Sequence, residues 1–220
     1  MRRSSLALIC LLAAAPASAQ VVRLSVSTAG TQANGPSTEV AISGDGRFIA
    51  FASLSTNLVS SDTNGVSDVF VHDRQTGQTT RVSVGTLVLT GSTTSAAQGN
   101  GAGDSPAISA DGGTVAFRSA ASNLVAGDTN GVADIFVHYR ATQQTTRVSL
   151  RKDGTQGDGP SYSPSISDDG RRVVYGTTSP GGGLQPASDD EGVTAYRGPN
   201  PFVTSLSPRR LRPRASSPSP

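Results

Sequence analysis

An internal repeat constrains the fold of this chain more than any other feature of its sequence. Residues 40–84 and 107–150 align throughout, and each landmark of the first copy recurs 66 positions later. The landmark pairs are Asp45 and Asp111, Phe51 and Phe117, Asn57 and Asn123, His72 and His138, and Arg81 and Arg147. A third, weaker copy follows at a spacing of 58, so the second unit carries eight extra residues, expected around 91–101. Such a period indicates one supersecondary unit used repeatedly.

Each unit contains four short segments with strand character. In the first unit they are residues 40–43, 48–53, 68–72 and 79–84, with an Asp-Gly turn between the first two. The equivalent segments are 107–109, 115–119, 134–138 and 145–150 in the second unit, and 165–167 and 173–176 in the third. Residues 22–26 resemble an additional fourth segment. The second and third segments are continuously apolar, which predicts burial on both faces. The chain is therefore expected to be all-β, with four-stranded antiparallel blades of a partial β-propeller.

Two motifs resemble those of a known family. Residues 42–53, ISGDGRFIAFAS, and residues 68–74, DVFVHDR, are similar to the TolB-like propeller repeat, a WD40-like family. The resemblance covers about residues 20–196, divided into units of about 20–84, 85–150 and 151–196. It implies a non-catalytic propeller scaffold in the cell envelope that acts through a protein partner.

The third unit departs from the pattern. Its Asp189 to Val193 matches residues 128–132 with three residues inserted, which places Ala195 at the position of Asp134 and predicts no third strand. Residues 197–220 are rich in Pro, Arg and Ser and are expected to be a disordered tail. This leaves two full blades and a degenerate third, whereas a closed propeller needs at least four. We therefore expect either a truncated or frameshifted gene product, which reading the DNA beyond this point would test, or copies that associate through their open, apolar blade faces.

The N-terminal residues predict export. Arg2 and Arg3 precede the apolar run 6–15, and Ala17-Ser18-Ala19 is a small-residue cleavage motif, so residues 1–19 read as a signal peptide. Export to the periplasm or the exterior follows. The one cysteine, Cys10, lies inside this segment and follows Ile9, where a lipoprotein cysteine would follow a small residue. No membrane anchor and no thiol chemistry are therefore expected.

The charge of the chain is unevenly distributed. The formal net charge is +2, but six of the 18 basic residues lie in the first three and the last twelve positions. Residues 21–208 hold 12 basic and all 16 acidic residues, which leaves a formal charge of about −4. Because a nucleic-acid footprint places basic residues on the folded surface, we expect no nucleic-acid partner.

One polar motif is a candidate metal site. The sequence D-T-N-G-x-x-D occurs at residues 62–68 and again at 128–134. Oxygen ligands at alternate positions of a turn suit a hard cation such as Ca²⁺. The alternative, which we favour, is a tight turn in which Asp and Asn side chains accept hydrogen bonds from nearby backbone amides. The calcium candidates are Asp62, Asn64, Asp68, Asp128, Asn130 and Asp134.

No motif predicts an enzyme. The two histidines are repeat equivalents, no G-x-S-x-G occurs, and Asp169 is the turn aspartate of its repeat. The glycines of GNGAGD, residues 99–104, are expected to form a flexible loop. Two alternatives to a scaffold remain. One is the propeller portion of a peptidase- or sialidase-associated hydrolase without its catalytic part, and the other is a calcium-stabilised surface protein.

Overall fold

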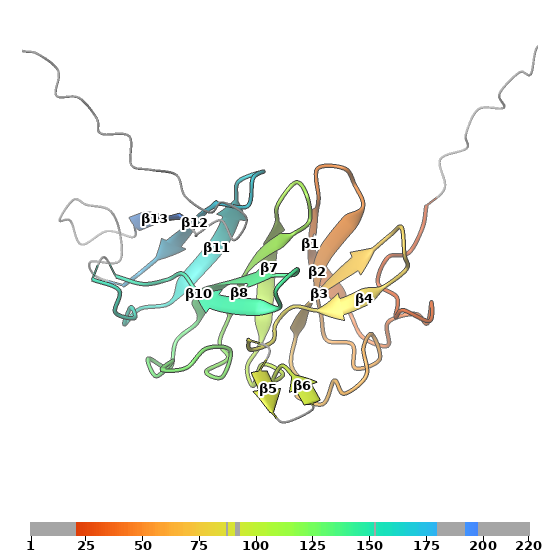
Figure 1. Ribbon diagram of the computed structural model, residues 1–220, viewed down its shortest axis with the longest axis horizontal. Coiled ribbons are helices and arrows are strands. Elements are labelled where there is room, and N and C mark those ends of the chain that lie inside the picture. Colours follow the sequence, from red (N-terminus) through yellow and green to blue (C-terminus); the bar gives the residue numbers. More distant parts are fainter. Residues whose placement is uncertain (1–20, 87, 91–92, 152, 180–191, 198–220) are drawn as a thin grey trace, which may run out of the picture.

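The computed structural model describes residues 21–86, 88–90, 93–151, 153–179 and 192–197. Within them the chain forms antiparallel sheets that fan out side by side in chain order (Figure 1). Blade 1 comprises β1 (Ser37–Ile42), β2 (Phe48–Ser53), β3 (Asp68–Asp73) and β4 (Thr79–Arg81). Blade 2 comprises β7 (Gly103–Ile108), β8 (Thr114–Ser119), β9 (Asp134–Tyr139) and β10 (Gln144–Arg147). Blade 3 comprises β11 (Ser161–Ile166), β12 (Arg172–Thr177) and β13 (Gly192–Arg197). This confirms the all-β, partial-propeller prediction.

The first strands of the three blades lie next to one another along the inner side of the fan. β1 contacts β7, and β7 contacts β11. The Asp-Gly turns that follow these strands are joined by backbone hydrogen bonds. Gly44 N–H donates to Ala110 O at 2.9 Å, and Ala110 N–H donates to Asp168 O at 3.0 Å. The blades are therefore connected at the same repeat position each time.

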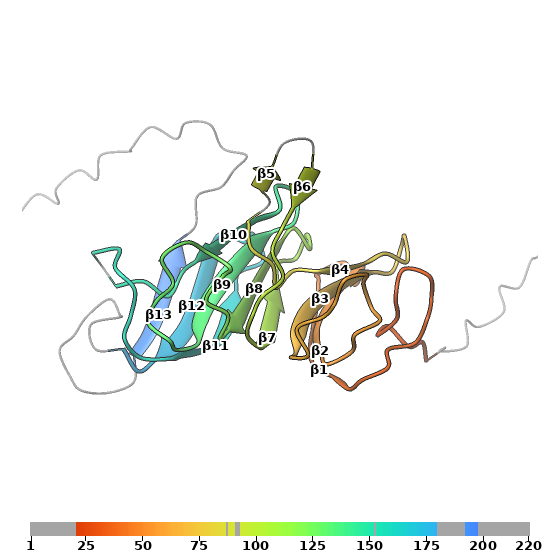
Figure 2. The ribbon, with the colours of Figure 1, turned by 90° about the horizontal axis from the view of Figure 1, so that it is seen from below.

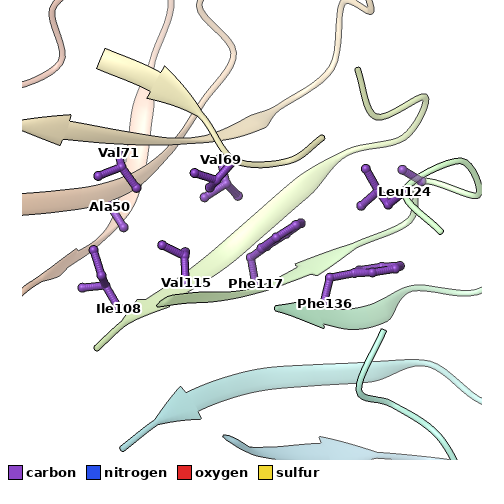
Figure 3. Packing of buried hydrophobic residues seen from close by; sticks show 10 residues of the cluster. Ala50, Val69, Val71, Ile108, Val115, Phe117, Leu124 and Phe136 are labelled. Carbon is purple, nitrogen blue, oxygen red and sulfur yellow. The ribbon is translucent and has the colours of Figure 1, made fainter. Parts of the chain in front are cut away.

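The apolar core lies between blades. Figure 3 shows Ala50, Val69 and Val71 of blade 1 facing Val115 and Phe117 of blade 2, all fully buried. A second cluster joins blade 2 to Val173 and Tyr175 of blade 3. The continuously apolar second and third strands are thus covered on both faces, as predicted. At about 25 cal/mol per Å² of apolar surface removed from water, this packing is the main term that holds adjacent blades together.

The N-terminal open face is more covered than the sequence suggested. Phe51 and Phe70 stack with ring centroids 5.8 Å apart and are at most 2% exposed, because Leu24, Ala33 and Val59 pack over them. Other apolar residues of blade 1 stay exposed, among them Val40 at 69% and Ile42 at 59%. Leu24 contributes to this cover although residues 22–26 do not form a strand; within them only an isolated bridge, Val26 to Gln32, is present.

The third blade has a third strand that the sequence did not predict. β13 pairs along the whole of β12, with Thr177 opposite Gly192 and Arg172 opposite Arg197. In blade 2 the same positions pair Ser119 with Asp134. Gly192, and not Ala195, is therefore the equivalent of Asp134, and the strand begins three residues earlier than the alignment implied.

The fourth strands and the insertion also differ from prediction. β4 ends at Arg81 and β10 at Arg147, where 79–84 and 145–150 were expected. The eight extra residues lie between Val84 and Gln98, a bridged pair that corresponds to Leu150 and Gln156. They include a small hairpin, β5 (Val88–Thr90) and β6 (Thr93–Ser95), which projects from the fan in Figure 2.

Two predictions fall outside the described residues. The signal peptide, residues 1–19, and residues 198–220 of the tail are among them. In the described ranges, no helix is long and apolar enough to cross a membrane.

Candidate functional site

Each of the two D-T-N-G-x-x-D loops packs around an arginine side chain of its own blade. In blade 1, Arg81 Nη1 lies 3.4 Å from both Asp62 Oδ1 and Asp68 Oδ2. The aspartate side chains are 3% and 0% exposed and the arginine side chain is 10% exposed. The loop supplies the first carboxylate, the start of β3 the second, and the end of β4 the cation. A single guanidinium thus balances two buried carboxylates.

Polar groups from neighbouring segments complete this arrangement. Asp68 Oδ1 accepts from Ser83 Oγ at 2.5 Å, and Asp68 Oδ2 accepts from Asn64 Nδ2 at 3.0 Å and Gln98 Nε2 at 3.2 Å. Gln98 Nε2 also donates to Asp62 Oδ1 at 2.9 Å. Both oxygens of Asp68 are therefore engaged, as a fully buried carboxylate requires.

Blade 2 repeats the arrangement. Arg147 Nη1 lies 2.9 Å from Asp128 Oδ1 and 3.4 Å from Asp134 Oδ2. Asn130 Nδ2 donates to Asp134 Oδ2 at 2.9 Å, and Ser149 Oγ donates to Asp134 Oδ1 at 2.6 Å. We refer to the groups Asp62–Asp68–Arg81 and Asp128–Asp134–Arg147 as the two arginine clamps. The six predicted site residues thus form two separate groups, one in each blade, and in each group the Asn donates to the second Asp of the clamp.

The electrostatics of the clamps follow from burial. Burial raises the pKa of Asp62, and the nearby Asp68 carboxylate raises it further, while Arg81 opposes both effects. Burial likewise raises the pKa of Asp128 against the opposing effect of Arg147. An arginine remains charged and can contact two carboxylates through its planar group, which suits a fixed structural role.

This geometry fits the turn interpretation in its local detail. Asn64 Oδ1 accepts from Val66 N–H at 3.1 Å, and Asn130 Oδ1 accepts from Val132 N–H at 3.3 Å, as in an Asx-type turn. Among the described residues, no group of three or more His, Cys, Asp or Glu side chains is arranged to hold a metal ion. Calcium binding at these residues stays an untested alternative to the turn that we favour, with its test given below.

Sequence reasoning missed the residues that come from elsewhere in the repeat. Gln98 opens the second unit but bonds to the clamp of blade 1, and Gln156 accepts from Arg147 Nη1 at 3.0 Å in blade 2. The repeat could have revealed these residues. Gln32, Gln98 and Gln156 recur at the spacings of the repeat, 66 and 58, and so do the Arg-x-Ser triplets of the fourth segments.

The two histidines are buried at equivalent positions of blades 1 and 2. His138 is 0% exposed, and its Nδ1 lies 3.0 Å from Thr145 Oγ1, whose own hydrogen is donated to Val84 O at 2.6 Å. Nδ1 must therefore carry the imidazole hydrogen, leaving Nε2 unprotonated and without a hydrogen-bond partner. Burial, and secondarily the charge of Arg140, lowers the pKa of His138 to about 4. His72 contacts Thr79 Oγ1 at 2.9 Å in the same way.

The remaining polar motifs have structural positions. Asp169 Oδ1 accepts from Ser167 Oγ at 2.6 Å within its turn, as predicted for a turn aspartate. The expected flexible loop GNGAGD is instead packed. A Cβ at Gly101 would lie 2.6 Å from Ala120 O, and Gly103 begins β7. At Gly101 a glycine is required because the backbone at Ala120, just after β8, approaches too closely for a Cβ.

Comparisons with known proteins return β-propellers. No protein-family model and no curated protein matches the chain. A TolB structure from Agrobacterium tumefaciens is 20% identical over 64% of this chain and 38% of that one, with a TM-score of 0.42. TolB from Acinetobacter baumannii is 16% identical over 74% and 41%, with a TM-score of 0.33. The propeller domain of the Trilobed protease from Pyrococcus furiosus is 16% identical over 66% and 35%, with a TM-score of 0.40. The chain thus spans about two fifths or less of each of these chains.

Proposed function

We propose that this protein is an exported, non-catalytic β-propeller scaffold that acts by contacting another protein. The main observation behind the proposal is that the buried polar side chains that could act in catalysis occur at equivalent positions in blades 1 and 2. Asp68, Arg81 and His72 bond within the blade or to the segment next to it. Asp134, Arg147 and His138 occupy the equivalent positions and do the same. A catalytic constellation would instead combine different groups at one place.

The clamps support a binding role for the loops that carry them. Each clamp fixes a loop whose tip residue, Thr63 or Thr129, is exposed. The two loops therefore present equivalent polar surfaces from neighbouring blades without needing to be ordered on binding. Pre-organised loops on a rigid scaffold lose less conformational entropy when a partner binds.

Site-specific photo-crosslinking in the exporting cell tests this role. A crosslinker at Thr129 should give a discrete product that is lost when Gly131 and Val132 are replaced by Glu. A matched crosslinker at Ala141, which is exposed at the opposite end of β9, should not give this product. Equal labelling from both positions would contradict a binding surface on the clamped loops.

Export and absence of catalysis have separate tests. Mass spectrometry of the chain from the periplasm or medium should find Gln20 at the N-terminus, whereas retention of Met1 in the cytoplasm would contradict export. The purified chain should not react with a fluorophosphonate probe for serine hydrolases. Labelling that is lost on heat denaturation would instead support the hydrolase alternative.

A further inference from the structure

The two open ends of the fan carry matching parts of one blade. In the described residues blade 3 has three strands, and no strand pairs with the outer edge of β13. At the other end, the segment Arg23-Leu24-Ser25-Val26 repeats Arg81 to Val84 and Arg147 to Leu150, at spacings of 58 and 66. The N-terminal segment therefore has the sequence of a fourth strand, although blade 1 already has its own.

This segment already contacts blade 1 as an outer strand contacts the blade that follows it. Thr79 Oγ1 donates to Val26 O at 2.5 Å, just as Thr145 Oγ1 donates to Val84 O at 2.6 Å. Val84 continues from β4, the outer strand of blade 1, when it makes its contact with blade 2. By equivalence, Val26 continues from the outer strand of a blade that would precede blade 1.

Residues 81–84 and 147–150 are hydrogen-bonded to the third strand of their own blade, whereas the equivalent N-terminal residues 23–26 have no such strand beside them in the described part of the chain. Val82 N–H donates to Val69 O at 2.8 Å, which joins the end of the fourth strand to the third strand of its own blade. Arg81 is partly buried in its clamp, whereas Arg23 is exposed and Val22 is 57% exposed. These residues are placed to pair with a third strand that the described part of this copy does not provide.

The register of that pairing follows from the repeats. Phe70 lies opposite Arg81, and Phe136 lies opposite Arg147. In blade 3 the same position is Thr194, which pairs with Tyr175 as Phe70 pairs with Phe51. A fourth strand added to β13 would therefore place Arg23 opposite Thr194.

The faces of the two end blades match as well. Ile42 of β1 is 59% exposed, whereas its equivalent Ile108 is 9% exposed because blade 1 covers it. Val174 of β12 is 39% exposed, whereas its equivalent Ala116 is fully buried against blade 3. Within one copy, Ala110 N–H donates to Asp168 O and so joins the turns of blades 2 and 3. The next bond in this series would run from Asp168 N–H to Gly44 O of a second copy. A contact between the two ends would thus repeat an interface that the molecule already contains twice.

We propose that two copies of this chain associate head to tail, with residues 21–26 of each copy forming the fourth strand of blade 3 in the other. Counting the three blades of the described residues in each copy, two copies give a ring of six, within the range of four to eight found for closed propellers. Three copies would give nine, outside that range. A head-to-tail contact that closes after two copies has twofold symmetry and leaves no open end for further growth.

Sedimentation and cysteine crosslinking test the proposal on the full chain carrying Cys10→Ser, which leaves no native cysteine. The sedimenting mass should be twice that of one chain. Arg23→Cys combined with Thr194→Cys should give a covalent dimer on a non-reducing gel, and a reductant should return it to monomer. The matched control pairs Arg23→Cys with Val193→Cys, because adjacent strand positions point to opposite faces. It should give at least about tenfold less dimer.

Charge introduced at an open face provides an independent measurement. Ile42→Arg should raise the dissociation constant of the dimer at least about tenfold, which corresponds to about 1.4 kcal/mol. Ala126→Arg, at an exposed position away from both open faces, should leave it unchanged. A folded monomer at every concentration would overturn the proposal. So would a monomeric disulfide between positions 23 and 194, since it would mean that the chain closes on itself.

Discussion

Replacing the arginine of one clamp tests most directly whether the clamp is a buried charge network that stabilises the fold. In Arg147→Met the carboxylates of Asp128 and Asp134, whose side chains are 4% and 1% exposed, would lose their shared cation. Breaking a buried ion pair by removing one partner costs about 3–5 kcal/mol, because a buried charge is left uncompensated. Ser149 and Asn130 still donate to Asp134, so we expect about 3 kcal/mol, measured by urea unfolding at pH 7.5.

The pH dependence of this loss checks its electrostatic origin. Burial already raises the pKa of Asp128, and Arg147 is the main influence that lowers it, so the variant should have a still higher folded-state pKa. A carboxyl whose pKa is raised on folding binds its proton more tightly in the native state, so lowering the pH stabilises the native state relative to the unfolded one. The cost of Arg147→Met should therefore be smaller at pH 5 than at pH 7.5.

Arg151→Met is the matched control. Its salt bridge to Asp158 is short, at 2.8 Å, but the two side chains are 33% and 63% exposed. Exposed ion pairs contribute roughly 0–1 kcal/mol, so this variant should lose less than about 1 kcal/mol. Adding Asp128→Asn to Arg147→Met should recover part of the loss. Equal costs for the two arginine substitutions, with no dependence on pH, would refute the view that the clamp is a buried charge network.

Three further predictions concern other parts of the chain. Because the pKa of His138 falls to about 4 on folding from an ordinary 6.5, stability present above pH 6.5 should be lost as the pH falls toward 4. The loss should reach about 3 kcal/mol by urea unfolding, and His138→Leu should flatten the dependence between pH 4.5 and 7. Calcium in millimolar excess over EDTA should leave the thermal midpoint unchanged; an ion bound at 100 times its dissociation constant would add about 2.7 kcal/mol and raise it visibly. Gly112→Ala should destabilise more than Gly131→Ala in thermal melts. Both have φ near +70°, costing about 1 kcal/mol, but only at Gly112 would a Cβ meet the Phe48 ring, at 2.1 Å.

The strands could be predicted from the sequence where they are buried on both faces, because such strands are apolar at successive positions. Residues 49–52 and 69–71 are apolar without interruption because both faces of these segments are buried, and the structure has β2 and β3 there. The fourth strand ended early for a local reason. Ser83 Oγ accepts from Val69 N–H at 3.1 Å and donates to Asp68, so a side chain replaces the backbone acceptor that would have extended the ladder.

β13 was missed because backbone pairing does not require the apolar pattern of its equivalents. The sequence Gly192 to Arg197 has no D-V-F-V motif, yet every residue of it pairs with β12. Its alignment depended on Asp189 and Asp190, whose resemblance to Asp128 and Thr129 shifted the expected position by three residues. The register of β13 is set by its pairing with β12 and not by a motif of its own.

The clamps show why the sequence predicted the members of a site but not its chemistry. Asp62, Asn64 and Asp68 are close in sequence, so their oxygens could be grouped from spacing alone. Arg81 and Gln98, which decide what those oxygens do, come from a later strand and from the next sequence unit. The spacing of the oxygens allowed either a tight turn or a cation site, but it did not reveal that a guanidinium 13 to 19 residues away contacts two of the carboxylates.

The repeat in the sequence and the blade in the structure are therefore offset. Gln98 opens the second sequence unit but bonds to the clamp of blade 1, and Thr145 of blade 2 donates to Val84, which follows the fourth strand of blade 1. Each blade thus depends on a segment belonging to its neighbour, through hydrogen bonds that are partly or fully buried. Because such bonds are costly to leave unmade, unfolding one blade exposes unsatisfied groups in the next. We therefore expect the described blades to unfold together.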